Sequence, residues 1–258
     1  MVKAVPDILA RILQRKTEEL QHRESDVELR AERATPDRRD FRAALLAHPV
    51  AVIAEIKQAS PSRGRIAQHF DPPSIAHHYE SGGAAALSVL TDRDFFEGSL
   101  AHLESARAAV TLPVLRKDFT TCEYHVIEAA AHGADAILLI AAALDTADLR
   151  RFRELAEQYR MAALVEVHDY EELLLAIDSG ASIIGVNSRD LRTFHVDLNV
   201  ALQLAESIPN DIIKVAESGI NSVADVRMLA RAGYRGFLVG EHLMRSPDPA
   251  EALRALIP

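Results

Sequence analysis

Residues 52–64 read VIAEIKQASPSRG, an apolar run that carries two opposite charges and ends in a loop of small, polar residues. Side chains alternate between the two faces of a strand, so Ile53, Glu55 and Lys57 share one face and the opposite face is wholly apolar. Taken alone, the stretch is typical of an amphipathic surface strand whose Glu55–Lys57 ion pair lies in solvent. The segments that follow it indicate a different position.

A repeat of strand, helix and glycine runs through the rest of the chain. Gly83, Gly133, Gly180 and Gly233 each stand where a helix should stop, and each is followed within three residues by an apolar run. Helix-start signals such as Asp145-Thr146, or Ser222 with Asp225 three residues later, lie between the runs. With the opening strand, the runs predict eight strands, the later seven at 86–91, 113–117, 135–140, 162–166, 182–187, 212–217 and 236–240.

Eight strands that alternate with helices, without a composition break between two halves, predict an α/β fold, a closed (β/α)8 TIM barrel over residues 49–258. An open α/β sheet is the alternative. Ahead of the barrel, apolar residues recur at helical spacing from Asp7 to about Ala34. They predict a charged N-terminal helical extension over residues 1–48, packed on the barrel mouth. It either covers the substrate or stabilises the end of the domain.

Composition narrows the functional class. The net charge of −9 leaves no basic footprint for nucleic acid or an anionic membrane, although a small cationic pocket remains possible. Cys122 is the only cysteine, which excludes a disulfide framework and a cysteine-based zinc site. The N-terminus lacks the apolar core of a signal peptide, and the longest apolar run, 136–144, is shorter than the ~20 residues of a membrane span. We therefore expect a cytoplasmic protein.

Polar residues stand at the carboxyl ends of most predicted strands. In a (β/α)8 barrel these ends form the active site. Bringing lysines, an arginine and carboxylates together there costs free energy of folding and would not be explained by stability alone. The pattern therefore predicts a catalytic mouth. Strand parity leaves open whether Arg116 or Lys117 points into the barrel. The strand-end residues are Glu55, Lys57, Thr91, Lys117, Asp118, Glu166, Asn187, Arg189, Glu217 and Glu241.

Two strand-to-helix turns resemble a phosphate cradle. Ser218-Gly219 and Gly240-Glu241 each place a glycine after the last two strands, where such barrels commonly bind phosphate through backbone N–H groups. Ser60, in the loop after the first strand, could add a hydroxyl. We expect only the backbone of Glu241 to meet an anion, with its side chain turned away.

Several motifs match a known family in order along the chain. They are Glu55-Ile-Lys57-x-x-Ser60-Pro61-Ser62-x-Gly64, Leu87-Ser-Val-Leu-Thr91-Asp, Phe96-x-Gly98-Ser99, Lys117-Asp118-Phe119, Glu166-Val, Gly185-x-Asn187-x-Arg189-Asp190-Leu191, Glu217-Ser218-Gly219-Ile220 and Leu238-Val-Gly240. Together they resemble the indole-3-glycerol phosphate synthase family. The resemblance implies a lyase of tryptophan biosynthesis that acts on a small phosphorylated substrate without cofactor or metal, as a monomer or weak homo-oligomer.

The resemblance also implies roles for individual residues. It makes Lys117 the general acid of ring closure, selecting it over Arg116, and Glu166 the base at dehydration. Lys57, beside Glu55, would hold a substrate carboxylate or shuttle protons, and whether Lys57 or Lys117 protonates the leaving hydroxyl stays open. Arg189 would bind the substrate carboxylate. The remaining residues would orient oxygens (Asn187, Ser218), bind phosphate (Ser60, Gly219, Gly240, Glu241) or form an apolar wall (Phe96, Phe119, Leu139, Leu191, Leu238).

Two alternatives remain. Phosphoribosylanthranilate isomerase, another phosphate-binding barrel, opens a sugar ring with a Cys/Asp pair, but Cys122 follows the third strand and not the first. A catalytically inactive barrel that serves as a scaffold should have lost some mouth residues, and all of them are present here.

Overall fold

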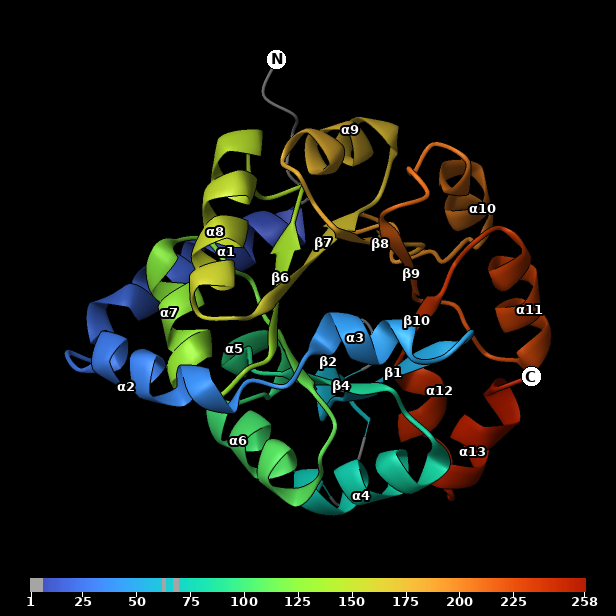
Figure 1. Cartoon of the computed structure of the whole chain (residues 1–258), viewed down its shortest axis with the longest axis horizontal. Coiled ribbons are helices and arrows are strands. Elements are labelled where there is room, and N and C mark those ends of the chain that lie inside the picture. Colours follow the sequence, from blue (N-terminus) through green and yellow to red (C-terminus); the bar gives the residue numbers. More distant parts are fainter. Residues whose placement is uncertain (1–6, 62–63, 67–69) are drawn as a thin grey trace.

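The computed structural model describes residues 7–61, 64–66 and 70–258, so Ser62 and Arg63 of the opening stretch lie outside the described residues. Eight parallel strands close into a barrel in the order β1-β10-β9-β8-β7-β6-β5-β4 (Figure 1). β1 pairs with both β4 and β10, which closes the sheet and excludes the open-sheet alternative. The strands are β1 (Ala51–Ile56), β4 (Ala86–Leu90), β5 (Val114–Lys117), β6 (Ala136–Ile140), β7 (Ala162–Val167), β8 (Ile183–Asn187), β9 (Ile213–Glu217) and β10 (Gly236–Val239).

Helices surround the strands as the repeat predicts, and the seven later strands begin and end within one residue of their expected bounds. The four glycines that were expected to stop helices have φ of 83° to 95°, a left-handed conformation that favours glycine. The helices around the barrel are α4 (Pro72–Gly82), α5 (Arg93–Phe96), α6 (Leu100–Ala109), α7 (Glu123–Ala131), α8 (Thr146–Gln158), α9 (Tyr170–Asp178), α10 (Asn199–Ala205), α11 (Val223–Arg231), α12 (Glu241–Met244) and α13 (Pro249–Leu256). A short hairpin, β2 (Ala59–Ser60) with β3 (Gly64–Arg65), follows β1.

The strands have two apolar faces. Val52, Ala54 and Ile56 pack in the outer core, between strands and helices, while Ile53 packs in the inner core of the barrel. Glu55 and Lys57 share the inner face with Ile53, as the alternation of strand side chains requires. The opening stretch is therefore a barrel strand whose charges point to the interior, and the surface-strand interpretation is wrong.

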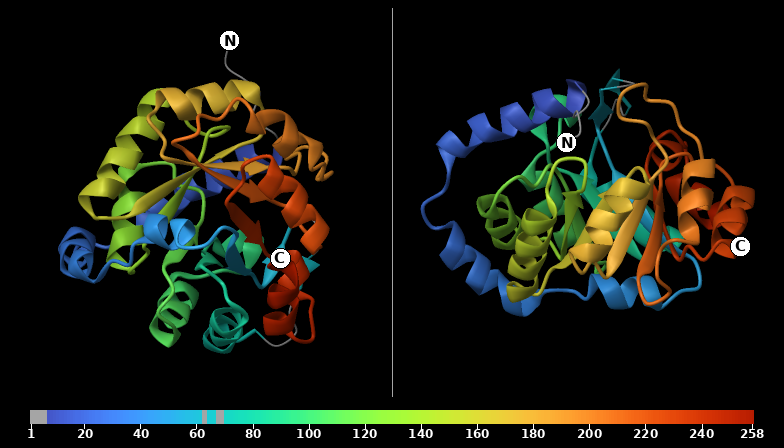
Figure 2. Two further views of the ribbon diagram at one scale, coloured as in Figure 1. Left: turned by 45° about the vertical axis from the view of Figure 1, so that its right-hand side comes forward. Right: turned by 90° about the horizontal axis from the view of Figure 1, so that it is seen from above.

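The helices of the N-terminal extension pack on three sides of the barrel, and only the first helix lies on the mouth. It consists of α1 (Asp7–Glu19), η1 (Leu20–His22), α2 (Val27–Ala34), η2 (Thr35–Asp37) and α3 (Phe41–Leu46). In the right-hand view of Figure 2, α1 runs along one end of the barrel and α3 along the opposite end. α2 packs against α7 on the side, and Phe41 and Leu45 of α3 join the inner core. No helix in the described part of the chain is long and apolar enough to cross a membrane.

Candidate active site

The carboxyl ends of the strands surround a cavity of about 830 Å³. Ile8, Leu9 and Ile12 of α1 form part of its wall. Apart from Leu139, the residues to which the family resemblance gives a role all line it: Glu55, Lys57, Ser60, Phe96, Lys117, Phe119, Glu166, Asn187, Arg189, Leu191, Ser218, Gly219, Leu238, Gly240 and Glu241. Of the other strand-end residues, Asp118 and Glu217 line the cavity, whereas Thr91 lies behind it and donates a hydrogen bond to Asp118. Side chains from all parts of the chain thus converge on one mouth.

Leu139 is a wrong assignment. Its side chain is fully buried in the outer core, between β6 and the helices. Leu138 and Ile140 are its neighbours on the strand, and both line the cavity. Because side chains of a strand alternate, a shift by one residue moves a side chain from the cavity to the opposite face.

Lys117 lies between two carboxylates. Its Nζ is 2.8 Å from Oε2 of Glu166 and 3.5 Å from Oε2 of Glu217. Burial on its own lowers the pKa of Lys117, but Glu166, Glu217 and Glu55 outweigh it and raise this pKa above the ordinary value. Lys117 is therefore held as an ammonium. Arg116, the other candidate on this strand, is turned away and binds Asp118 and Glu128.

Glu55 and Lys57 form a second pair at the mouth. Lys57 Nζ donates to Oε1 of Glu55 at 2.5 Å, and only 16% and 7% of the two side chains are exposed. Gly240 makes room for this pair, because a Cβ there would lie 2.3 Å from Glu55 Oε1. The glycine after β10 thus has a packing role in addition to the phosphate role that its sequence position suggests.

Glu217 is a member of the site that the sequence analysis noted only as a polar strand end. It is buried, and its Oε1 has no hydrogen-bond partner among the described residues. Burial raises the pKa of Glu217; Lys117 opposes this effect and the charges of Glu166 and Glu55 add to it. A Cβ on Gly185 would lie 2.0 Å from Oε1, so the glycine of β8 leaves space for the carboxyl. In the sequence, the Glu217-Ser218-Gly219 motif is the feature that could have identified Glu217 as a residue of the site.

His168 is a second residue that the sequence analysis missed. Its Nε2 is 3.3 Å from Oε1 of Glu166, and its Nδ1 is 2.9 Å from Oε2 of Glu172. Burial alone lowers the pKa of His168, but the neighbouring carboxylates of Glu166 and Glu172 raise it to about 10. Lys117 and His168 together offset burial and lower the pKa of Glu166 below its ordinary value. Glu166 is therefore held ionised between two cations.

Arg189 and Glu241 face each other at the other side of the cavity. Arg189 donates to the carbonyl of Phe194 at 3.2 Å, and its other terminal nitrogen is 3.9 Å from Oε2 of Glu241. The side chain of Glu241 was expected to turn away, but it lines the cavity and also lies 3.5 Å from Arg245. Asn187 accepts a hydrogen bond from the backbone N–H of Arg189 at 3.0 Å, which ties the amide to this loop.

The turn after β9 is tight. Ser218 and Gly219 have φ of 64° and 79°, and a Cβ on Gly219 would lie 2.6 Å from Cγ1 of Val196. Only glycine fits this position without moving the loop after β8.

Cys122 lies at the start of α7, partly buried and away from the end of β1. No group of three or more His, Cys, Asp or Glu residues within the described ranges is placed to hold a metal ion.

A closed barrel with lysine–carboxylate pairs at the carboxyl ends of its strands defines a (β/α)8-barrel enzyme with an acid–base site. The family model for indole-3-glycerol phosphate synthase matches residues 9–256. The chain therefore belongs to the indole-3-glycerol phosphate synthase family, which comprises carboxy-lyases of tryptophan biosynthesis. The resemblance drawn from the motifs is confirmed, and a barrel of the phosphoribosylanthranilate isomerase kind is set aside.

Individual relatives agree with the family. The chain is 51% identical over 233 residues to an indole-3-glycerol phosphate synthase of Mycolicibacterium gilvum, covering 90% of this chain and 85% of that protein. It is 49% identical over 255 residues to one from Desulfotalea psychrophila, covering 97% and 98%. A thiamine phosphate pyrophosphorylase from Pyrococcus furiosus, 19% identical, superposes with a TM-score of 0.62 over 82% of this chain and 95% of that one. At this identity the similarity shows the barrel fold alone.

Proposed function

We propose that this chain converts 1-(2-carboxyphenylamino)-1-deoxyribulose 5-phosphate into indole-3-glycerol phosphate, carbon dioxide and water. The observation that carries the proposal is the position of Lys117, between Glu166 and Glu217 and beside an apolar wall. The reaction needs a proton donor at a ketone, a base at a carbon, and a surface for an aromatic ring. The cavity offers all three.

Ring closure begins when the aromatic carbon that bears the carboxylate attacks the C2 ketone. A bond forms between the two carbons, and the carbonyl oxygen takes a proton and becomes a hydroxyl. Lys117 donates this proton, because its neighbouring carboxylates keep it charged in the free site. Loss of carbon dioxide then returns the electron pair to the ring and restores its aromaticity.

Dehydration completes the indole. Glu166, held ionised by Lys117 and His168, removes a proton from C1 while the C2 hydroxyl leaves as water. The leaving hydroxyl takes a proton from Lys57 or Lys117. Glu217 is a third group that holds a proton, because burial raises its pKa, and its Oε1 is available to the substrate.

The remaining residues bind and orient. Phe96 and Phe119, with ring centroids 6.1 Å apart, pack against the anthranilate ring together with Leu138. Arg189 binds the substrate carboxylate through its planar guanidinium, exchanging Glu241 for the ligand. Asn187 orients a substrate oxygen. The phosphate binds to backbone N–H groups at Gly219 and Gly240 and to the hydroxyls of Ser60 and Ser218.

The test is direct. Purified protein is incubated with the carboxyphenylamino substrate, and the fluorescence of the indole product is followed, with phosphoribosylanthranilate as the comparison substrate. We expect indole formation from the first compound and no reaction with the second. A folded protein that forms no indole product would contradict the proposal. We also expect a cytoplasmic monomer or weak homo-oligomer, which fractionation and gel filtration check.

A further inference from the structure

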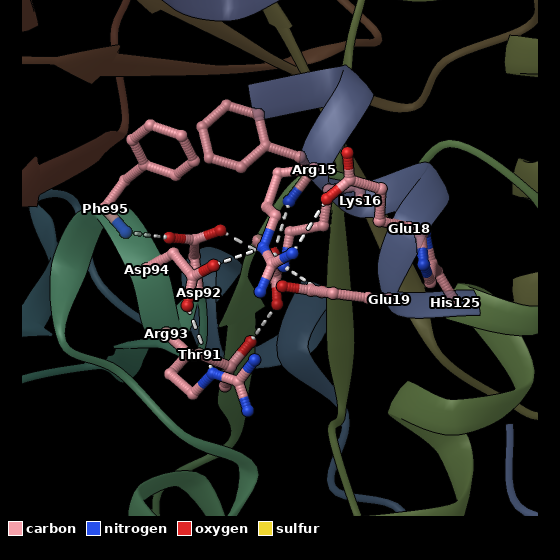
Figure 3. Close-up of polar contacts among 12 residues, drawn as sticks. Arg15, Lys16, Glu18, Glu19, Thr91, Asp92, Arg93, Asp94, Phe95 and His125 are labelled. Carbon is pink, nitrogen blue, oxygen red and sulfur yellow. Dashed lines mark hydrogen bonds and ion pairs between the residues drawn. The ribbon is translucent and has the colours of Figure 1, made fainter. Parts of the chain in front are cut away.

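Lys16 is a buried cation on the mouth-covering helix α1. Only 4% of its side chain is exposed, although most of α1's charged residues reach solvent. Its Nζ lies 2.8 Å from Oδ1 of Asp118, 3.1 Å from Oδ2 of Asp92 and 3.0 Å from Oε2 of Glu19. Figure 3 shows Lys16 and Glu19 reaching from α1 toward Asp92. Burial alone lowers the pKa of Lys16, but Asp118 and Asp92 raise it above the ordinary value, so the charge is retained.

Of the two aspartates that bind Lys16, Asp118 lines the cavity itself, and Asp92 supports a helix whose Phe96 lines it. Asp92 accepts a hydrogen bond from the backbone N–H of Phe95 at 2.8 Å and so caps the short helix α5, which carries Phe96. Asp118 stands between Lys117 and Phe119 in the chain and accepts from the N–H of Phe119 at 2.8 Å. One ammonium thus joins α1, the β4–α5 turn and the end of β5.

Asp118 also has hydrogen-bond partners on the side away from Lys16. Its Oδ2 accepts from Thr91 Oγ1 at 2.5 Å and from Arg116 at 3.1 Å, and Arg116 binds Glu128 of α7 at 2.7 Å. The carboxylate facing Lys16 is therefore rigidly placed, and the position of α1 on the barrel follows from it. The pKa of Asp118 is lowered because Lys16 and Arg116 outweigh the effect of burial.

Stability alone is a weak reason for this arrangement. A buried ion pair commonly contributes little more than apolar residues of the same volume, because both charges lose their hydration. Arg15, the next residue on α1, makes the ordinary kind of contact: its side chain is 39% exposed and pairs with Asp94 and Glu18 at the surface. Asp94 belongs to α5, so Arg15 also contacts the helix of Phe96, but through an exposed pair. Lys16 differs because its contacts are buried and because it also binds Asp118, the neighbour of Phe119.

We propose that Lys16 is a positioning residue for the reaction: through Asp92 and Asp118 it holds α1, Phe96 and Phe119 together as one wall of the substrate cavity. Lys16 does not line the cavity itself, so it acts through these neighbours. This inference rests on the proposed function, since substrate turnover is its readout. It makes the mouth-covering helix part of the binding site, with Ile8, Leu9 and Ile12 as its apolar contribution.

The test compares Lys16→Met with Arg15→Met, two losses of one positive charge on the same helix. At a temperature where each variant is folded, we expect K16M to raise KM about 10-fold or more while kcat stays within about 3-fold. R15M should leave both constants within about 2-fold, because exposed ion pairs contribute little. Amide hydrogen exchange of α1 should be faster in K16M than in R15M.

A second background separates positioning from stability, because K16M takes the shared cation away from the buried Asp92 and Asp118, and Asp118 still keeps Arg116. Asp92→Asn removes one of these charges and still caps α5, since asparagine is a good N-cap. We compare two drops in melting temperature: from D92N to K16M/D92N, and from the wild type to K16M. The first drop should be smaller than the second. KM should nevertheless be raised in K16M/D92N relative to D92N. If KM in either background stays within about 2-fold of its parent, the proposal is overturned. A wild type without turnover refutes the proposed function instead.

Discussion

Two buried carboxylates at opposite ends of the barrel show how the ends differ. Asp135, just before β6, has both oxygens satisfied: Oδ1 accepts from the backbone N–H of Arg39 at 2.8 Å, and Oδ2 accepts from that of Val114 at 2.9 Å. The guanidinium of Arg107 also binds it, at 3.1 Å and 3.3 Å. Glu217, at the end of β9, has Lys117 at 3.5 Å and an Oε1 without a hydrogen-bond partner in the described part of the chain.

The contrast extends to the surroundings. The Asp135 end is closed by α3, whose Phe41 and Leu45 fill the inner core. The Glu217 end is open to the cavity and holds Glu55, Lys57, Lys117 and Glu166. Asp135 is fully hydrogen-bonded, as expected of a polar group that serves the fold, whereas Glu217 keeps bonding capacity, as expected of a group that meets a substrate. On the proposed mechanism, one end of the barrel thus serves stability and the other serves the reaction.

The largest expected effect is at the mouth. Lys117→Met should lower kcat by about 10²-fold or more with substrate still bound, because the variant loses the proposed proton donor of ring closure. Steady-state kinetics with indole fluorescence measure this effect, and the melting temperature shows whether the variant is folded. Near-normal turnover would remove Lys117 from the acid role.

Arg189→Ala should weaken substrate binding. We expect KM to rise about 10- to 100-fold with a smaller change in kcat, because in the proposed mechanism the guanidinium binds the substrate carboxylate before and during the reaction. The matched control is Arg150→Ala, an arginine on α8 whose side chain is 48% exposed. An unchanged KM in R189A would contradict the carboxylate-clamp assignment.

At the opposite end, Asp135→Asn should act on stability alone. The amide cannot replace both acceptor oxygens, so we expect the free energy of unfolding to fall by about 1–3 kcal/mol. Urea unfolding measures the loss, and Asp178→Asn, with a side chain that is 74% exposed, is the control. kcat and KM at a temperature where the variant is folded should match the wild type. A change in either constant would mean that the two ends are coupled.

The smallest effect is a pH dependence. Because the pKa of Glu217 is raised by folding, the folded state binds its proton more tightly than the unfolded state, and stability from this group is lost as pH rises above the ordinary carboxyl range. Glu217→Gln removes that loss. The stability of E217Q relative to the wild type should therefore increase by about 1 kcal/mol between pH 5 and pH 8. Glu154→Gln, exposed on α8, should show no such trend; a flat difference for E217Q would contradict the assignment.

The barrel was predictable because its strands are continuous apolar runs and its helices end in glycine, both of which are local signals. Most of the site followed from one rule, that active-site residues stand at strand ends. Leu139 shows the limit of the rule. β6 is apolar on both faces, so its sequence does not tell which of Leu138 and Leu139 faces the cavity.

The missed features depend on contacts between distant segments. His168 and Glu217 acquire their properties from Glu166 and Lys117 across the mouth, and no local pattern reports those distances. The division of the N-terminal extension among three sides of the barrel depends on tertiary packing, because its charged helical pattern looks uniform in sequence. Lys16 looks like an ordinary charged residue of a surface helix until Asp92 and Asp118 are placed beside it.

The double variant Lys117→Met/Glu166→Gln tests most directly whether the charges of the mouth serve the reaction and not the fold. Its melting temperature and turnover are measured beside those of the wild type and D135N. We predict turnover lower by about 10³-fold or more and a melting temperature equal to or above that of the wild type, because neutralising a buried ion pair removes its desolvation cost. A melting temperature as low as that of D135N, or turnover close to that of the wild type, would contradict the account.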